Sequence, residues 1–377
     1  MKFLHLSDLH LGKRLCGFSL MEDQEYILGE ILRTVRAEAP DGVILAGDIY
    51  DRSVPPTEAV MLFDRFLTEL AAQTKVFIIS GNHDSAERLA FGAELFSREG
   101  VYLAPLWDGT LTPITLHDEY GDVNVYLLPF LKPVHVRQAF PDSEIETYTD
   151  AIARALAEAP LSPTARNVLV THQFVAGSTR AESEEITVGG TDAVAADIFA
   201  DFDYVALGHL HTPQFSAPNA RYSGTPLPYS FSEAKDEKSL TAVTLGAKGD
   251  VSLRTIPLSP LHPMREIRGT YDELMAHSYW YQTSLTTDYL HVILTDEEDI
   301  PNAVGQLRTV YRGLMKLEYD NLRTRATGIT EVTEGTAEKS PAELFADFYE
   351  AQNGAPLTTE RAEFLQALID DVWEVNA

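Results

Sequence analysis

Seven side chains able to bind a metal ion follow five short apolar runs of this sequence. The runs are 3–6, 43–46, 76–79, 168–170 and 204–207, and the side chains after them are Asp8, His10, Asp48, Asn82, His172, His209 and His211. Short runs rich in Val and Ile are typical of buried strands. Because ligands bind in open α/β sheets where such strands end, the pattern predicts a metal site.

The seven side chains suit two cations that share one ligand. Two divalent ions about 3.5–4 Å apart can stabilise both the attacking and the leaving oxygen of a phosphoryl transfer. A carboxylate has two oxygens, which makes Asp48 the candidate bridge. We expect one ion to take Asp8, His10 and His211, and the other to take Asn82, His172 and His209. This donor set suits Mn²⁺, Fe²⁺ or Zn²⁺ better than Mg²⁺ or Ca²⁺, and we favour Mn²⁺.

His83 adjoins Asn82 but is surplus to the ligand count. It could face the substrate and either protonate the leaving alkoxide or steady the transition-state charge, and Asp84 could fix its tautomer. Taken singly, several of the motifs fit an ordinary structural role, and only their combination favours a metal site. The remaining histidines end no such run and are expected to be structural: His5, His117, His135, His262, His277 and His291.

Composition limits the compartment and the partners. The 377 residues include 57 acidic and 29 basic ones, a formal net charge of −28 that repels polyanions. Either this acidity carries no functional content, or tight DNA binding relies on a basic partner. The single cysteine, Cys16, permits no internal disulfide and favours a reducing compartment. We find no signal peptide and no membrane span, and expect a cytoplasmic protein.

Strand and helix signals alternate along the chain, as in a layered α/β fold. Apolar residues recur at helical spacing before Pro40 and again after Pro55-Pro56. We expect a first unit at 1–261, a small α+β unit at 262–322, a linker at 323–339 and two helices at 340–377.

The order Asp-x-His, Gly-Asp, Gly-Asn-His-Asp, His, Gly-His-x-His resembles that of the calcineurin-like metallophosphoesterases. That resemblance implies a four-layer α-β-β-α sandwich with a dinuclear metal site. Six longer sequence segments also resemble those of the SbcD family of bacterial nuclease subunits. They are 7–12, 47–51, 171–174, 222–226, 230–233 and 263–267.

The SbcD resemblance implies a Mn²⁺-dependent DNA nuclease, with 3′-to-5′ exonuclease action on double strands and endonuclease action on single strands and hairpins. It implies work with the SbcC ATPase, in an SbcC2–SbcD2 heterotetramer, during replication, recombination and repair. Residues 262–322 would be a capping, DNA-binding domain, and 340–377 would dock on SbcC. The seven ligands and the catalytic histidine, His83, carry over from the family. Some relatives have a second histidine where this chain has Asp51, which could orient His83 or have no role.

Two other functions remain open at this point. A phosphatase or cyclic nucleotide phosphodiesterase could use the same site, and the Gly-Asp-x-x-Asp-Arg text at 47–52 resembles that of phosphatases. A non-catalytic scaffold is the third hypothesis. Scaffolds on this fold normally lose metal ligands, and none of the seven is missing here.

Overall fold

The computed structural model describes residues 1–181, 184, 192–322 and 324, with isolated positions between 342 and 369. The chain divides into two compact units, Met1–Met264 and Arg265–Ala377. The predicted linker at 323–339 and the predicted helices at 340–377 lie outside the described residues, apart from those isolated positions. Within the described part, every helix is too short or too polar to cross a membrane.

Two six-stranded sheets form the centre of the first unit. In order, one contains β14 (Val251–Pro257), β13 (Ser239–Leu245), β1 (Lys2–Leu6), β4 (Gly42–Ala46), β5 (Lys75–Ile79) and β6 (Val101–Ala104). The other contains β11 (Gln214–Ala217), β12 (Ala220–Tyr222), β10 (Tyr204–Gly208), β9 (Arg166–His172), β8 (Gly121–Leu128) and β7 (Ile114–Asp118). β1, β4, β5 and β6 run parallel, as do β8, β9, β10 and β12. The carboxyl ends within each parallel set therefore lie at one edge of the sheet.

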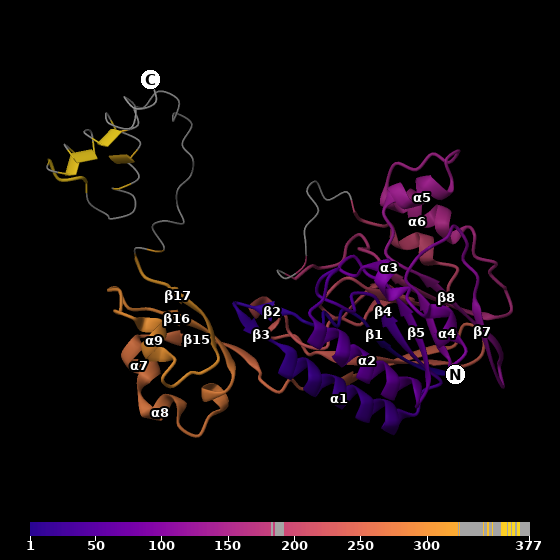
Figure 1. Cartoon of the computed structure of the whole chain (residues 1–377), viewed down its shortest axis with the longest axis horizontal. Helices are drawn as coiled ribbons and strands as arrows, with labels where there is room; N and C mark the ends of the chain where they lie inside the picture. The colour runs from indigo at the N-terminus through magenta and orange to yellow at the C-terminus, as the bar shows by residue number, and fades with distance from the viewer. Residues whose placement is uncertain are drawn as a thin grey trace. The chain divides into compact units, whose positions relative to one another are not determined.

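Helices cover the outer face of each sheet. α1 (Met21–Glu38) and α2 (Thr57–Ala71) lie on one side of the unit, and α5 (Pro133–Ala139) and α6 (Tyr148–Leu156) lie on the other (Figure 1). α1 buries Ile27, Ile31 and Val35 at helical spacing and ends at Glu38, and Ala39 after it adopts a left-handed conformation just before Pro40. The predicted four-layer α-β-β-α sandwich is confirmed.

The short elements of the first unit join these layers. They are β2 (Arg14–Leu15), β3 (Phe18–Ser19), α3 (Ala86–Leu89), α4 (Ala93–Ser97), η1 (Ala196–Phe199) and η2 (Phe231–Glu233).

The main core lies between the two sheets. Phe3, Ile44 and Phe77 of one sheet share it with Val125 and Val170 of the other, and all five are fully buried. Helices bury the opposite faces of the same strands, which explains why the strand sequences are continuously apolar. His5 lies in this core, where its Nδ1 is 2.8 Å from the hydroxyl of Tyr204, so the structural role expected for it is confirmed.

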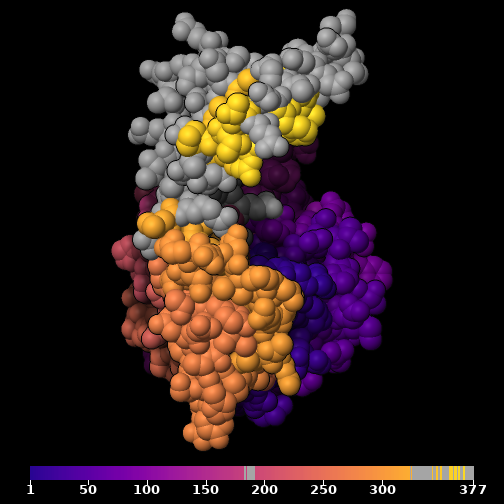
Figure 2. Space-filling view, turned by 90° about the vertical axis from the view of Figure 1, so that its left-hand side faces the viewer, coloured from indigo at the N-terminus to yellow at the C-terminus, as the bar shows by residue number. Residues whose placement is uncertain are grey.

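The second unit, which is orange in Figure 2, has a sheet and a core of its own. Its sheet has the order β15 (Met264–Gly269), β16 (Tyr289–Leu294), β17 (Leu314–Tyr319). The helices are α7 (Tyr271–Met275), α8 (His277–Trp280), η3 (Ser284–Thr286) and α9 (Ala303–Leu307). Thr270 caps α7 by accepting a hydrogen bond from Glu273 N. This is the small α+β unit expected from the sequence.

Candidate metal centre

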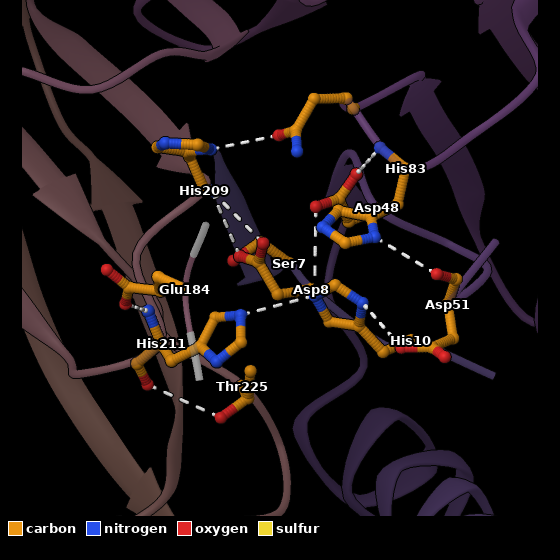
Figure 3. Close-up of polar contacts among 12 residues, drawn as sticks. Ser7, Asp8, His10, Asp48, Asp51, His83, Glu184, His209, His211 and Thr225 are labelled. Carbon is orange, nitrogen blue, oxygen red and sulfur yellow. Dashed lines mark hydrogen bonds and ion pairs between the residues drawn. The ribbon is translucent and has the colours of Figure 1, made fainter. Parts of the chain in front are cut away.

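The predicted ligands gather where the strands of both sheets end. Asp8 and His10 follow β1, Asp48 follows β4, and Asn82 follows β5, while His172 ends β9 and His209 and His211 follow β10. The loops after β1 and β4 are joined by hydrogen bonds from Asp8 N to Gly47 O and from His10 N to Asp48 O, both 3.0 Å. The structure brings all seven predicted ligands and His83 into one region. Figure 3 shows the side chains of Asp8, His10, Asp48, His83, His209 and His211 around a common space.

Four of these residues have a backbone conformation that non-glycine residues rarely adopt. The φ angles of Asp8, His10, Asp48 and His209 are 54°, 44°, 49° and 105°. Such conformations cost free energy, persist only where the surrounding structure enforces them, and cluster at functional sites. Here they turn each side chain sharply at the end of its strand, toward the other ligands.

Asp8, His10 and His211 form the first of two clusters. One ligand atom from each lies within 4.8 Å of those of the other two. The Nε2 atoms of His10 and His211 are 3.2 Å apart, and all three side chains are buried. Two imidazole nitrogens face each other stably only with a proton or a cation between them, so this geometry fits one of the two predicted ion positions.

Asn82, His172 and His209 form the second cluster. The Oδ1 atom of Asn82 lies 3.1 Å from His172 Nε2 and 2.9 Å from His209 Nδ1. His172 Nδ1 donates to the carbonyl oxygen of Ala46 at 2.8 Å, which directs Nε2 into the cluster. A nitrogen of each imidazole therefore approaches the amide oxygen of Asn82, an arrangement that fits the predicted second ion position.

Asp48 lies between the two clusters. Its Oδ2 atom is 3.3 Å from His172 Nε2 and 3.7 Å from His10 Nε2, while its Oδ1 atom accepts a hydrogen bond from His83 N at 2.8 Å. A carboxylate that faces a ligand of each cluster is placed as a bridging ligand should be. The donor set and its arrangement thus fit a pair of divalent cations.

The electrostatics of the site favour cation binding. Burial raises the pKa of Asp8. Burial acts in the same direction on Asp48, but the charge and hydrogen bond of His172, together with the charges of His10 and His83, outweigh it and hold the pKa of Asp48 well below its usual value. Burial alone would lower the pKa of His172, yet the charge and hydrogen bond of Asp48, with smaller contributions from Asp8 and the carbonyl oxygen of Ala46, raise it to about 9. Ligand atoms of Asp8, Asp48 and His172 lie within 4.8 Å of one another, so two buried carboxylates share a small space that positive charge stabilises.

Neighbouring glycines leave no room for a side chain beside these ligands. A Cβ atom at Gly81 would overlap Asp48 Oδ1, and one at Gly208 would overlap the carbonyl oxygen of Ala46. The close approach of the strand ends therefore requires glycine at both positions.

The side chain of Asp84 does not contact His83 as the sequence predicted. The Asp84 carboxylate accepts hydrogen bonds from the backbone N–H groups of Ile49, Tyr50 and Gly81, because three donors in the loops around it converge there. The contact to the imidazole comes instead from Asp51, whose carbonyl oxygen is 3.0 Å from His83 Nδ1. The expectation that Asp84 fixes the tautomer of His83 is thus corrected, since the backbone of Asp51 makes that contact.

Asp51 also has a contact through its side chain. Its carboxylate pairs with Lys13 Nζ at 2.8 Å and lies 3.7 Å from His10 Nδ1. Asp51 therefore touches both His83 and His10, whereas the sequence left its role open.

A second layer of polar residues, which the sequence did not single out as functional, surrounds His211. Glu233 Oε1 lies 3.4 Å from His211 Nδ1, and because a carboxylate only accepts, Nδ1 is the donor and Nε2 faces the site. The other oxygen, Oε2, accepts from Lys238 Nζ at 2.7 Å and from Thr225 Oγ1 at 3.2 Å. Glu184 Oε1 accepts from the backbone N–H of His211 at 2.6 Å (Figure 3). Glu233 and Lys238 are 1% and 4% exposed, so this is a buried ion pair behind a candidate ligand.

Two buried side chains form hydrogen bonds with the backbone of the loop that carries Asp8 and His10. Gln24 of α1 donates from Nε2 to His10 O at 2.8 Å and accepts from Gly12 N at 2.9 Å. Tyr229 donates its hydroxyl proton to the carbonyl oxygen of Leu9. Both are buried polar residues far from the loop in sequence, and no motif in the sequence links them to it.

Comparisons with known proteins agree with this geometry. Residues 1–213 match the family model described as calcineurin-like phosphoesterase, and 260–353 match the model described as type 5 capsule protein repressor C-terminal domain. The chain is 32% identical to the SbcD subunit of the SbcCD nuclease of Staphylococcus saprophyticus over 381 residues, which cover 99% of both proteins.

Solved structures give weaker matches. A crystal structure from Thermus thermophilus is 14% identical, with a TM-score of 0.37 over 67% of this chain and 98% of that one. A dimetal phosphatase from Danio rerio is 12% identical, with a TM-score of 0.36 over 69% of this chain and 98% of that one.

The two-sheet sandwich and the match over 1–213 define a metal-dependent phosphoesterase of the calcineurin-like class. Within that class, the 32% identity over nearly the full length shows that the chain belongs to the SbcD family of nuclease subunits. The expectation of an enzyme, a metal-dependent phosphodiesterase, is thereby confirmed.

Proposed function

We propose that this chain is a Mn²⁺-dependent DNA nuclease, a 3′-to-5′ exonuclease on double strands and an endonuclease on single strands and hairpins. The observation that carries the proposal is the placement of Asp48 between two clusters of donor atoms, with His83 beside them. Bound divalent cations would supply Lewis acidity to the scissile phosphate and favour deprotonation of the attacking water. Mn²⁺ is proposed because several imidazoles stand among carboxylate and amide oxygens.

The protein groups have separate tasks in this proposal. Asp8, His10 and His211 would hold one cation, Asn82, His172 and His209 would hold the other, and Asp48 would serve both. His83 donates from Nδ1 to the carbonyl oxygen of Asp51, so Nε2 is the atom that can hand a proton to the leaving oxygen. The carboxylate of Asp51, which also pairs with Lys13, lies beside His10 Nδ1 and steadies the His10 ring while its Nε2 faces the other ligands.

We further propose that the chain acts with an ATPase subunit of the SbcC type, in a 2:2 assembly in the cytoplasm, during replication, recombination and repair. The name of the 32% identical relative supports such a complex, and the net charge of −28 favours a basic partner for DNA capture. Residues 262–322, which overlap a unit with its own sheet and core, are proposed as the capping domain that contacts DNA. The proposed docking segment, 340–377, lies largely outside the described residues.

A single panel of substrates tests these proposals. The purified chain with Mn²⁺ is offered hairpin DNA, a phosphoprotein and a cyclic nucleotide, each with and without the ATPase subunit and ATP. We expect cleavage of the hairpin by the chain, and faster cleavage of duplex ends when the ATPase subunit is added. Preferred hydrolysis of the phosphoprotein or the cyclic nucleotide would replace the nuclease proposal with one of the two alternatives on the same site.

Replacing the proposed acid gives a variant for the same panel. His83→Asn should lower the rate of DNA cleavage by roughly 10²–10⁴-fold, the usual worth of a positioned acid or base, while two metal ions per chain are retained. The control is His117→Asn, which changes an exposed histidine of β7 that is paired only with Asp122 in the described structure. Full activity of His83→Asn would remove its catalytic assignment.

A further inference from the structure

A cavity of about 200 Å³ opens beside the second cluster of ligands. Its lining includes Asn82 and His209 of that cluster, together with Phe130, Lys132, Tyr148, Phe174 and Asp192. Four of these seven side chains are aromatic rings. The lining comes from the loops after β5, β8, β9 and β10 and from the first turn of α6, so the cavity belongs to the same edge of the sandwich as the metal centre.

The aromatic wall begins at the candidate ligands themselves. Phe130 lies nearly parallel to His209, with ring centres 6.4 Å apart and planes 16° apart, and meets His172 edge-on at 6.3 Å. The backbone N–H of Phe130 donates to Ser80 O at 3.0 Å, which fixes it to the loop that carries Asn82. A group attached to a phosphate at the metal centre would therefore reach this wall directly.

Phe174 is held in place on the cavity wall. The guanidinium carbon of Arg180 lies 3.7 Å from the centre of its ring, and Arg180 is in turn paired with Asp192 at 2.7 Å. A ring anchored in this way loses little conformational entropy when a second flat group packs on the wall. Lys132 adds an exposed positive charge, which suits a neighbouring phosphate.

We propose that this cavity receives a nucleobase of the DNA strand whose phosphate lies at the metal centre. The inference rests on the proposed nuclease function and deepens it. Aromatic walls stack on every base, so the subsite would accept bases with little sequence preference. At about 200 Å³ it is smaller than the ~300–1,000 Å³ pockets that take drug-sized ligands, which suits one base rather than a base pair. The strand must then be single or frayed where it is cut.

Two small ligands isolate the contribution of the base. Thymidine 5′-monophosphate and 2-deoxyribose 5-phosphate carry the same phosphate and differ in the base. Calorimetric titration of the full chain with Mn²⁺ should show the nucleotide binding roughly 5- to 150-fold more tightly, the range that one aromatic stacking contact gives. Equal dissociation constants for the two ligands in the unaltered chain would overturn the proposal.

Variants locate the effect in this cavity. Phe174→Leu keeps an apolar side chain but removes the ring, and Tyr148→Ala removes a second ring. Each variant should lower the ratio of the dissociation constant of deoxyribose 5-phosphate to that of the nucleotide severalfold. The dissociation constant of deoxyribose 5-phosphate itself should not change. Phe215→Ala is the matched control, because Phe215 is a 53% exposed aromatic residue of β11 outside the cavity lining. An undiminished ratio in both variants would place the base elsewhere and refute the subsite.

The two proposals fail in different ways. If the unaltered chain prefers the nucleotide but cuts no DNA, the base subsite stands and the nuclease proposal falls. If it cuts DNA but binds both ligands equally, the nuclease proposal stands and the base subsite falls.

Discussion

Glu233→Gln tests whether the buried carboxylate behind His211 tunes the metal centre. Glu233 accepts from His211 Nδ1 and keeps Nε2 aimed at the site. Glutamine has nearly the same volume but no charge, so it holds the imidazole less firmly and makes its nitrogen a poorer ligand. Loss of such an outer partner typically costs 10–100-fold in metal affinity. The contact is long, at 3.4 Å, so we expect the lower end, about tenfold or ~1.4 kcal/mol.

The same substitution has a separate effect on folding. It removes the partner of Lys238, whose side chain is 3% exposed and lies 2.7 Å from Glu233. Breaking a buried ion pair from one side costs about 3–5 kcal/mol. Asp236 at 3.6 Å and the oxygens of His211 and Thr225 still surround the ammonium group, so a loss near 3 kcal/mol is expected.

A double variant separates the two effects. Glu233→Gln with Lys238→Met removes both buried charges of this ion pair and should recover most of the unfolding free energy, while metal affinity stays about tenfold low. Affinity is measured by calorimetric titration of metal-stripped protein with Mn²⁺, and stability by urea unfolding in the presence of a chelator. If the double variant binds Mn²⁺ as tightly as the unaltered chain, Glu233 has no role in orienting His211, and the single variant acted only through the stranded lysine.

Two further predictions concern the positions around the site and the core. Gly81→Ala should weaken Mn²⁺ binding about 10–100-fold without altering a ligand, because its Cβ displaces Asp48, and unchanged binding would contradict that steric account. Its control, Gly29→Ala in α1, meets only Arg33 Nη1 at 3.9 Å and should add about 0.5–1 kcal/mol of stability. Burial lowers the pKa of His5 to about 3 in the folded protein. Between pH 6.5 and 3 the unfolded chain therefore binds a proton at this residue that the folded protein does not, and the free energy of unfolding falls as the pH falls through that window. Between pH 7.5 and 5.5 this amounts to about 1.4 kcal/mol, and urea unfolding of His5→Gln should show a pH-dependent loss smaller by that amount, with His117→Gln as the control.

Local sequence was sufficient to predict the strands that precede the candidate ligands and a layered α/β fold, whereas the four-layer arrangement was expected from the family resemblance. The apolar runs before Asp8, Asp48 and His172 are strands because both faces of each sheet are covered, and that condition leaves a continuous apolar signature. Turn pairs such as Gly121-Asp122 mark hairpins for the same local reason, and β8 does begin at Gly121. The candidate ligands could be named from the sequence because each lies at or shortly after the end of its strand.

The supporting residues could not be predicted in the same way. Glu233 and Lys238 meet His211 only after β10, β11 and β12 have reversed the chain, so their partnership depends on tertiary structure. Asp84 adjoins His83 in sequence, yet nearby backbone donors capture its carboxylate. Phe130 and Phe174 resemble ordinary apolar residues, because nothing in their local pattern shows that their rings line a cavity.

The left-handed backbone at Asp8, His10, Asp48 and His209 has an evolutionary consequence. Replacing such a residue by glycine relieves strain, and at the aspartates it also removes repulsion between buried carboxylates. A descendant that loses its catalytic power by these routes can therefore fold as robustly as its ancestor. Selection for stability alone would not preserve these four residues. Only continued selection for the catalytic activity keeps residues with such strained backbone conformations in place.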